Sequence, residues 1–343
     1  MRRLVVDLRS RTRAFRLPDD VAEQLIAATP VGWTTLVVGA ETDSFGDGAQ
    51  VPSAESMAAI ADAEVYFGYG MPKPLFLAAS RLRWTHTATA GVASLLFAEM
   101  LGSDVVITNS AGVYGPPIAE HVLAGVMFFL RAFDLAGVQQ RLARWAPEPF
   151  ATDEARVREV AECRVLVVGT GGIGREVARR FSALGACVTG VRRTPARGTP
   201  EGFHRVVAPN RLDDELAAAD VLVLAAPLTA ETRTLLTAAR IARLPDGAIV
   251  CNVSRGALLD EPALEAALRS GRLRGAVLDV FAQEPLPLES PLWQLPRVLL
   301  TPHVAGVSPG RFWERLTALF FDNWSRYRRG EPMRNLVDKQ AGY

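Results

Sequence analysis

The chain has 343 residues, which at roughly 150 residues per domain predicts two domains. It carries 38 Lys and Arg against 37 Asp and Glu, so its net charge of +1 provides no field that favours nucleic acid or an anionic membrane as a partner. Hydrophobic residues make up 49% and charged residues 22% of the chain, which is the composition of an ordinary globular protein and excludes extensive disorder.

The N-terminus and the cysteines predict a cytoplasmic protein. Asp7 interrupts the first apolar run, so the start of the chain lacks the apolar core of a signal peptide. The apolar stretch at 122–130 is shorter than the roughly 18 residues of a membrane span. Cys163, Cys187 and Cys251 have no CxxC spacing and lie in apolar runs, so we expect them to be buried and reduced. We expect no metal.

Short runs of Val, Ile and Leu alternate with helical stretches along the whole chain. Near-continuous apolar runs are typical of strands that are buried on both faces, which predicts parallel sheets. The expected strands are at 4–8, 35–40, 64–69, 82–89, 105–110, 164–169, 187–192, 221–226, 248–253, 276–280 and 298–303. Because these eleven strands are too many for one regular sheet, they predict an α/β fold with two doubly wound parallel-sheet domains.

The order of the elements predicts that one domain is inserted in the other. Pro116 and Pro117 begin a long apolar helix over 118–131, at the position where a missing backbone N–H has the least effect. An amphipathic helix over 308–330 follows the last strand. The predicted segments are the N-terminal part of a flavodoxin-like substrate domain at 1–109, a Rossmann dinucleotide-binding domain at 110–304, and a C-terminal helix at 305–343 that returns to the substrate domain.

The sequence GTGGIG at 169–174 lies between a predicted strand and a predicted helix, where a dinucleotide-binding turn belongs. Its first glycine permits a tight turn, its second lets the backbone approach a pyrophosphate, and its third allows the helix to pack closely on the strand. The helix N-terminus supplies N–H groups to the phosphates. The alternative is a glycine turn without a ligand. The cofactor-binding residues expected here are Gly169, Gly171, Gly172, Ile173 and Gly174.

The end of the next strand predicts which dinucleotide is bound. NAD-binding domains place an acidic residue there for the ribose 2′-hydroxyl, whereas this chain has Arg192 and Arg193. A guanidinium can bind a 2′-phosphate through two hydrogen bonds. The pair therefore favours NADP(H), with NAD(H) as a possible cofactor. The alternative is two solvated arginines in an arginine-rich protein.

Three side chains with charged or titratable groups, which are suited to catalysis, follow three different strands. Arg255 comes after the strand at 248–253, Glu284 is in the loop after the next strand, and His303 ends the last one. In open α/β sheets, ligands bind beyond the carboxyl ends of the strands. Singly, these residues could be a surface arginine, a solvated glutamate and a core histidine. Together, they predict an active site.

These residues and their surroundings resemble those of the D-isomer-specific 2-hydroxyacid dehydrogenases, in the branch that includes glyoxylate/hydroxypyruvate reductases. The resemblance covers nearly the whole chain. The segments that carry it are TNSAGVYGPPIAEHVLA at 108–124, the GTGGIG turn, APLTAETRTLL at 226–236, NVSRGALLDEPALEAALRSGRL at 252–273, LDVFAQEPLP at 278–287, TPHVAG at 301–306 and the final NLVDKQAGY.

The resemblance implies a role for each candidate catalytic residue. Arg255 would bind the carboxylate of a 2-keto acid and polarise its carbonyl group. His303 would be the general acid that protonates the carbonyl oxygen as hydride reaches C2. Glu284 would orient the imidazole and raise its pKa.

The resemblance also implies the binding residues. The loop TATAGVAS at 87–94 is similar to the substrate loop of the family, whose backbone N–H groups cradle the carboxylate. The substrate-binding residues expected from it are Ala90, Gly91 and Val92, together with Arg255. The further cofactor-binding positions are Ala226, Pro227, Asn252, Val253, Asp279, which would lie near the nicotinamide carboxamide, and His303.

The sequence departs from the family pattern in two places. The arginine pair replaces the acidic residue of NAD-preferring members, and the segment ASLLFAEML lacks the Asp that often follows the substrate loop, which leaves the substrate open. Two other histidines also have two interpretations. His86 could line the substrate cleft or pack at a strand end, and His121 could pack in its helix or at a subunit interface.

These features predict an enzyme that reduces a small 2-keto acid to a D-2-hydroxy acid with NADPH, with glyoxylate or hydroxypyruvate as a narrower hypothesis. The alternative is a dinucleotide-sensing regulator or corepressor on the same fold, although a sensor has no need of a general acid. By resemblance we expect a homodimer that uses the helix at 117–140, and hinges at 109–116 and 304–309 that close over the substrate. We expect neither nucleic acid nor membrane as a partner.

Overall fold

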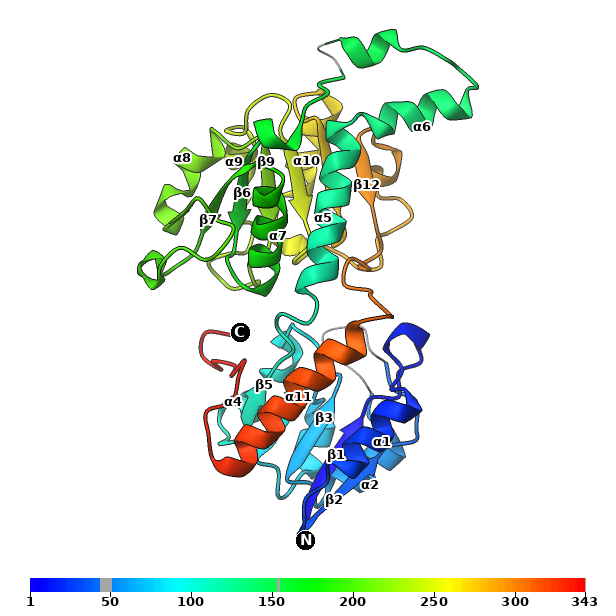
Figure 1. Ribbon diagram of the computed structural model, residues 1–343, viewed down its shortest axis with the longest axis vertical. Coiled ribbons are helices and arrows are strands. Elements are labelled where there is room, and N and C mark those ends of the chain that lie inside the picture. Colours follow the sequence, from blue (N-terminus) through cyan, green and yellow to red (C-terminus); the bar gives the residue numbers. More distant parts are fainter. Residues whose placement is uncertain (44–50, 153–154, 343) are drawn as a thin grey trace. The chain divides into compact units, whose positions relative to one another are not determined.

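A computed structural model of the protein describes residues 1–43, 51–152 and 155–342. The chain forms two compact units, each built on a parallel sheet (Figure 1). Unit 1 consists of Met1–Tyr114 and Val307–Tyr343, and unit 2 consists of Gly115–Gly306. Unit 2 is therefore inserted in the sequence of unit 1. The assignment of substrate and dinucleotide binding to these two units stays a prediction.

Unit 1 contains a five-stranded parallel sheet with the strand order β2-β1-β3-β4-β5. This is the flavodoxin-like order, as expected from the sequence. The strands are β1 (Arg2–Asp7), β2 (Trp33–Val37), β3 (Val65–Gly68), β4 (Trp84–Thr87) and β5 (Val106–Thr108). Its helices are α1 (Asp19–Ala27), α2 (Ala54–Ile60), α3 (Lys73–Ala78), α4 (Ala98–Leu101) and α11 (Phe312–Arg329).

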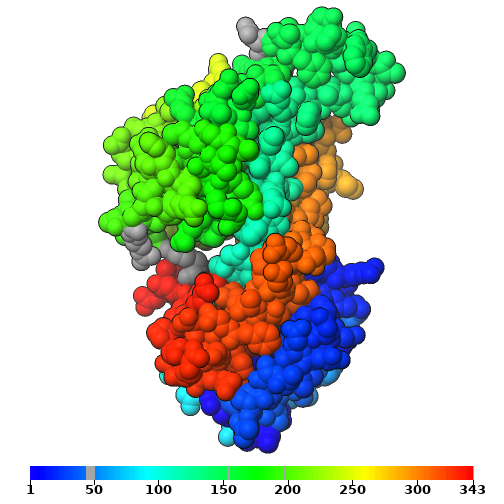
Figure 2. Space-filling model, in the orientation of Figure 1, coloured from blue at the N-terminus to red at the C-terminus, as the bar shows by residue number. Residues whose placement is uncertain are grey.

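Both faces of this sheet are covered, because successive residues of a strand point to opposite faces. Leu4 and Val6 of β1 belong to an apolar cluster with residues of α1 and α11, whereas Val5 belongs to a second cluster with residues of α2 and α3. The helices α1 and α11 lie together on the first face (Figures 1 and 2). Phe320 of α11 stacks on Phe67 of β3 with ring centroids 4.1 Å apart. The helix that follows unit 2 thus completes the core of unit 1.

Unit 2 contains a seven-stranded parallel sheet with the order β12-β11-β10-β9-β6-β7-β8. Counted from β6, this is the Rossmann order 3-2-1-4-5-6 with one more strand. The strands are β6 (Arg164–Val168), β7 (Cys187–Val191), β8 (Arg205–Val207), β9 (Val221–Leu224), β10 (Ile249–Asn252), β11 (Gly275–Leu278) and β12 (Val298–Leu300). Its helices are α5 (Gly115–Leu130), α6 (Phe133–Arg141), α7 (Gly172–Ala183), α8 (Leu212–Leu216), α9 (Ala238–Ile241) and α10 (Glu261–Arg269).

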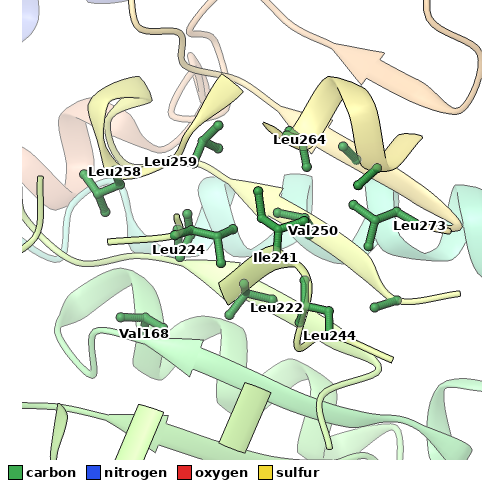
Figure 3. Packing of buried hydrophobic residues seen from close by; sticks show 14 of the residues in the cluster. Val168, Leu222, Leu224, Ile241, Leu244, Val250, Leu258, Leu259, Leu264 and Leu273 are labelled. Carbon is green, nitrogen blue, oxygen red and sulfur yellow. The ribbon is translucent and has the colours of Figure 1, made fainter. Parts of the chain in front are cut away.

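One face of this sheet packs on α8, α9 and α10 through a single large apolar cluster (Figure 3). Leu222 and Val250 of the strands meet Ile241 of α9 and Leu264 of α10 there. The opposite face packs on α5 and α7. A Cβ at Gly125 of α5 would lie 2.7 Å from a side-chain methyl of Val277 of β11, so the helix backbone packs directly on this side chain.

The prediction of two doubly wound parallel sheets is confirmed. All eleven predicted strands overlap a strand of the structure, and the described residues contain one strand that was not predicted, β8. This strand is a short, partly exposed edge strand, so its sequence RVV lacks the pattern of a buried strand. The prediction that all three cysteines are buried was wrong for Cys187, which begins β7 and is exposed.

The segment from α6 to residue 152 projects from the body of unit 2 (Figures 1 and 2). Its base is held by Arg274, whose guanidinium donates to both carboxylate oxygens of Asp134 at 2.8 and 2.7 Å and lies over the ring of Phe129. No single helix of the described residues is long and apolar enough to cross a membrane; only α5 and α6, taken as one pair bent by 67°, meet that length and composition.

Replacing Arg274 by Met should destabilise the protein by about 3 kcal/mol, because it leaves the largely buried Asp134 carboxylate without its partner. The free energy of unfolding from chemical denaturation measures this effect. Arg311→Met, which breaks the exposed pair with Glu314, is the matched control and should leave that free energy unchanged. Equal effects of the two substitutions would contradict the anchoring role of Arg274.

Candidate active site

The segments that carry the predicted site residues of unit 2 leave its sheet at one edge. Backbone hydrogen bonds align the strand ends: Ala225 N–H donates to Val168 O at 2.8 Å, Asp279 N–H to Asn252 O at 3.1 Å, and Thr301 N–H to Leu278 O at 3.0 Å. Because all these strands are parallel, the residues that follow them lie at the same carboxyl edge. The residues brought to this edge include Gly169, Ala226, Pro227, Val253, Asp279 and His303.

The glycine turn between β6 and α7 has the features that a dinucleotide requires. Gly169 has φ +103°, and a Cβ there would lie 2.5 Å from Ala225 O, while a Cβ at Gly174 would lie 1.9 Å from Gly169 O. By contrast, no atom lies within 4 Å of a Cβ placed on Gly171. Thus Gly169 and Gly174 allow close packing within the protein, and Gly171 leaves open space for a ligand.

The N-terminus of α7 supplies donors to this open space. The first hydrogen bond of the helix runs from Arg175 N–H to Gly171 O at 2.9 Å. The N–H groups of Gly172, Ile173 and Gly174 precede it and have no acceptor within the helix. Such unpaired N–H groups and the helix dipole favour a phosphate. The residues present therefore fit the pyrophosphate of a dinucleotide.

The two arginines after β7 have different surroundings. The Arg192 guanidinium donates to Pro195 O at 3.2 Å and to Gly198 O, so it holds the loop that follows the strand. Arg193 is exposed, and its charge helps to lower the pKa of Glu231 after the larger effect of the hydrogen bond from Thr229. Of the predicted pair, Arg193 is thus the more exposed residue.

A set of hydrogen bonds fixes the turn that carries Arg255. The buried Asn252 side chain donates to Arg255 O at 3.0 Å and accepts from Ser254 N–H at 3.2 Å. The amide nitrogen and the amide oxygen of this side chain are therefore both hydrogen-bonded to the protein backbone. A Cβ at Gly256 would lie 1.8 Å from the Phe281 carbonyl carbon, so the Arg255 turn packs directly on the loop that leads to Glu284.

Glu284 and His303 form the central polar pair. Their carboxylate Oε2 and imidazole Nδ1 are 2.7 Å apart, and Glu284 Oε1 accepts from Phe281 N–H at 3.0 Å. Burial alone would raise the pKa of Glu284, but the hydrogen bonds from His303 and Phe281 lower it. The hydrogen bond to Glu284 raises the pKa of His303 against the effects of burial and of the Arg255 charge. Among the described residues, no hydrogen bond reaches His303 Nε2, which is therefore the nitrogen available to a ligand.

The loop that carries His303 is held by the buried carboxylate of Asp279. This carboxylate accepts from Thr301 Oγ1 at 2.6 Å, from Val304 N–H at 2.8 Å and from Ala305 N–H at 2.9 Å. His303 N–H donates to the Asp279 carbonyl oxygen at 2.8 Å, and His303 has a left-handed φ of +55°. The Asp279 side chain, expected at the nicotinamide carboxamide, is thus occupied in shaping this loop.

His121 has a contact that the sequence did not indicate. Its Nε2 lies 3.1 Å from Thr301 Oγ1. Because the Thr301 hydroxyl donates its proton to Asp279, His121 is the donor in this contact. The helix α5 is therefore linked to the His303 loop. The two residues are 180 positions apart, so no local sequence signal could have paired them.

In unit 1, the predicted substrate loop turns its carbonyl groups into the protein. The carbonyl oxygen of Thr89 accepts from Ser110 N–H at 2.9 Å, that of Ala90 from Asn109 Nδ2 at 2.9 Å, and that of Gly91 from Thr89 Oγ1 at 2.8 Å. In a trans peptide, the C=O and the following N–H point in opposite directions. The N–H groups of Ala90, Gly91 and Val92 therefore point away from these partners, and no hydrogen bond within the described residues uses them.

His86 lies in the core of unit 1 and not on its surface. Its side chain is fully buried, and its ring nitrogens contact Thr108 Oγ1 at 2.6 Å and Ser110 Oγ at 3.3 Å. Burial lowers the pKa of His86 to about 3, so the imidazole is neutral at physiological pH. Of its two interpretations, the packing role at a strand end is the one that agrees with this environment. The described residues contain no group of three or more His, Cys, Asp or Glu side chains arranged to hold a metal ion.

Comparison with known proteins identifies related sequences. Residues 123–305 match the family model described as D-isomer specific 2-hydroxyacid dehydrogenase, NAD binding domain. A protein of Salmonella newport (strain SL254) named glyoxylate/hydroxypyruvate reductase A is 34% identical over 280 residues, which cover 79% of this chain and 85% of that protein.

Two solved structures show the same similarity over the whole chain. A D-isomer specific 2-hydroxyacid dehydrogenase from Xanthobacter autotrophicus Py2, in complex with NADPH and MES, has a TM-score of 0.79 and 33% identity, with 99% of each chain covered. An NADPH-dependent glyoxylate/hydroxypyruvate reductase from Sinorhizobium meliloti, in complex with NADP and sulfate, has a TM-score of 0.80 and 27% identity, with 100% of each chain covered.

Replacing Glu284 by Gln should lower the pKa of His303, because the amide keeps the size of the side chain but removes the negative charge that stabilises the imidazolium. Histidine ring resonances followed by NMR across pH measure this change. Glu261→Gln is the matched control, since Glu261 accepts from Ala282 N–H of the same loop. The account fails if the His303 pKa is the same in Glu284→Gln as in the wild type.

Proposed function

The chain belongs to the D-isomer-specific 2-hydroxyacid dehydrogenase family, and on that premise we propose that it is an NADP(H)-dependent reductase that converts a small 2-keto acid into the D-2-hydroxy acid. Hydride transfer between a nicotinamide dinucleotide and a 2-hydroxy or 2-keto acid is the chemistry of this family. Glyoxylate and hydroxypyruvate are the proposed substrates, because relatives with these names match most of the chain.

The observation that carries this proposal is the pair of His303 and Glu284 at the carboxyl edge of a sheet that also bears the glycine turn. A protonated imidazole with a raised pKa and an unpaired Nε2 is suited to give a proton to a substrate oxygen. A protein that only senses a dinucleotide has no use for such a group. The proton donor therefore favours an enzyme over a regulator.

In the proposed mechanism, the backbone N–H groups of Ala90, Gly91 and Val92 bind the substrate carboxylate. The Arg255 guanidinium binds the carboxylate and polarises the keto group. A nicotinamide dinucleotide held by unit 2 would supply the hydride that C2 receives. His303 Nε2 gives its proton to the carbonyl oxygen, and in the reverse direction neutral His303 takes the hydroxyl proton. Glu284 stays ionised, holds Nδ1 and stabilises the imidazolium.

We propose that unit 2 binds the cofactor, through the glycine turn, the N-terminus of α7 and the segments after β9, β10 and β11. The open space at Gly171 and the unpaired N–H groups of the helix support the pyrophosphate position. The exposed guanidinium of Arg193 supports a preference for the 2′-phosphate of NADP(H), and Arg192 contributes by holding the adjacent loop.

We also propose a cytoplasmic protein whose partners include neither nucleic acid nor a membrane. Cys163, Cys187 and Cys251 are all free thiols, as expected in a reducing compartment, and the net charge is +1. Cell fractionation that finds the protein in the membrane or exported fraction would contradict this location.

The wild-type enzyme should oxidise NADPH in the presence of small 2-keto acids, at a kcat/KM at least roughly tenfold higher than with NADH, since one charge-assisted hydrogen bond to the 2′-phosphate is worth this much. Absorbance at 340 nm with glyoxylate, hydroxypyruvate, pyruvate and phenylpyruvate measures both substrate and cofactor preference. Cofactor binding without turnover of any keto acid would instead support the dinucleotide-sensing alternative.

The Arg193→Gln variant tests the cofactor part of the same prediction. Its KM for NADPH should rise roughly tenfold while its KM for NADH stays unchanged, because only NADPH carries the 2′-phosphate. Arg211→Gln is the control, since Arg211 is also exposed on this unit and lies outside the segment that follows β7. If Arg193→Gln leaves the KM for NADPH unchanged, Arg193 does not bind the 2′-phosphate, and this part of the proposal is wrong.

We further propose a homodimer that uses the projecting segment of unit 2. Phe133, Val138, Leu142 and Trp145 expose 57%, 43%, 65% and 96% of their surface there, and such an apolar group on one segment is typical of an interface. Light scattering should give twice the mass of one chain, and Leu142→Asp should shift the equilibrium towards the single chain. A wild-type protein with the mass of one chain would exclude the dimer.

A further inference from the structure

Residues 335–339 form a segment to which the proposed mechanism gives no role. Leu336 forms an antiparallel bridge with Thr108, and Val337 N–H donates to Ile107 O at 2.9 Å, so the segment runs along β5, the edge strand of unit 1. Farther along, Lys339 Nζ donates to Met100 O at 2.9 Å and to Ser103 O at 2.7 Å. The segment therefore covers a sheet edge, and it brings Asn335 to the turn that follows β5.

Asn335 clamps this turn with both its side chain and its backbone. Its Nδ2 donates to Asn109 O at 3.1 Å and to Ala111 O at 2.8 Å, and its carbonyl oxygen accepts from Asn109 N–H at 3.2 Å. Asn335 has φ +54°, a left-handed conformation that asparagine tolerates better than most residues. The turn at 109–111 is thus fixed by a residue more than 200 positions away in the sequence.

The turn at 109–111 also orients the predicted substrate loop. The buried side chain of Asn109 donates to Ala90 O at 2.9 Å and is held in place by Ala111 N–H, which donates to its Oδ1 at 3.1 Å. The neighbouring Ser110 N–H donates to Thr89 O at 2.9 Å. Because the carbonyl groups of Thr89 and Ala90 point towards the 109–111 turn, the N–H groups of Ala90 and Gly91, in the same peptide planes, point away from it.

We propose that Asn335 is a positioning residue for substrate binding: through the 109–111 turn, it sets the direction of the backbone N–H groups of Ala90 and Gly91 that receive the substrate carboxylate. The proposal rests on the proposed function, which makes these N–H groups the carboxylate site. It gives Asn335 a role in the affinity for the keto acid and none in the affinity for the cofactor.

The test uses Asn335→Gly in the full chain, with Asn335→Asp as a second variant. Glycine adopts φ +54° without strain, and aspartate keeps the size of the side chain, but both lack the two N–H donors. With glyoxylate or hydroxypyruvate as the substrate, KM for the keto acid should rise roughly tenfold, while KM for NADPH changes less than about twofold. A role limited to stability would lower Tm and leave the KM for the keto acid unchanged, which would overturn the proposal.

Lys339→Met is the matched control, because it removes an anchor of the same segment and leaves the contacts of Asn335 in place. It should lower Tm without changing either KM. An equal rise of the keto-acid KM in Lys339→Met and Asn335→Gly would show a general loosening of the segment and would also overturn the proposal.

A second readout does not depend on turnover. In spectra of protein labelled with ¹⁵N-glycine, the Gly91 amide resonance should shift or broaden in Asn335→Gly and stay unchanged in Lys339→Met. If the wild type reduces no keto acid, the proposed function fails, and this comparison alone decides the positioning of the loop. An unchanged Gly91 resonance in Asn335→Gly would refute the inference whatever the activity.

Discussion

The buried carboxylate of Asp279 is the constraint on which the proposed chemistry depends. It accepts hydrogen bonds from Thr301, Val304 and Ala305, which lie on both sides of His303, the proposed proton donor. A left-handed backbone at a residue other than glycine costs of the order of 1 kcal/mol or more. The hydrogen bonds to Asp279 offset this cost, so that the imidazole is presented to Glu284 on one side and remains available through Nε2 on the other.

In both units, a polar side chain is hydrogen-bonded to the backbone of a loop that carries predicted site residues. In unit 2, side chains of Asn252 and Asp279 bind the backbone of the loops that carry Arg255 and His303. In unit 1, Asn109 binds the carbonyl group of the loop whose N–H groups are proposed to receive the substrate. In each case, a polar side chain of the protein fixes a loop at the carboxyl edge of a parallel sheet through hydrogen bonds to its backbone. Such preorganisation reduces the rearrangement that binding and reaction require.

The sequence was sufficient to predict the architecture, and it placed the candidate site residues directly after the strands. Buried parallel strands appear as apolar runs, so all of them except the short edge strand β8 could be predicted, and the glycine turn and the Arg255, Glu284 and His303 positions follow such runs directly. The supporting contacts could not be predicted. His121 meets Thr301 across 180 positions, and Asn335 meets Asn109 across 226, so only the folded chain brings them together. The division of roles between Arg192 and Arg193 likewise depends on the course of a loop and not on the pair itself.

The most direct test of the central claim is the pH dependence of kcat/KM for keto-acid reduction by the wild type and by Glu284→Gln. In the proposed mechanism, reduction needs protonated His303, whose pKa is raised by the hydrogen bond to Glu284, so kcat/KM should fall as the pH rises through that raised pKa. Because Glu284→Gln removes the stabilising charge, the same fall should occur at lower pH. A fall at the same pH in both proteins, or no fall at all, would contradict the account of His303 as the proton donor.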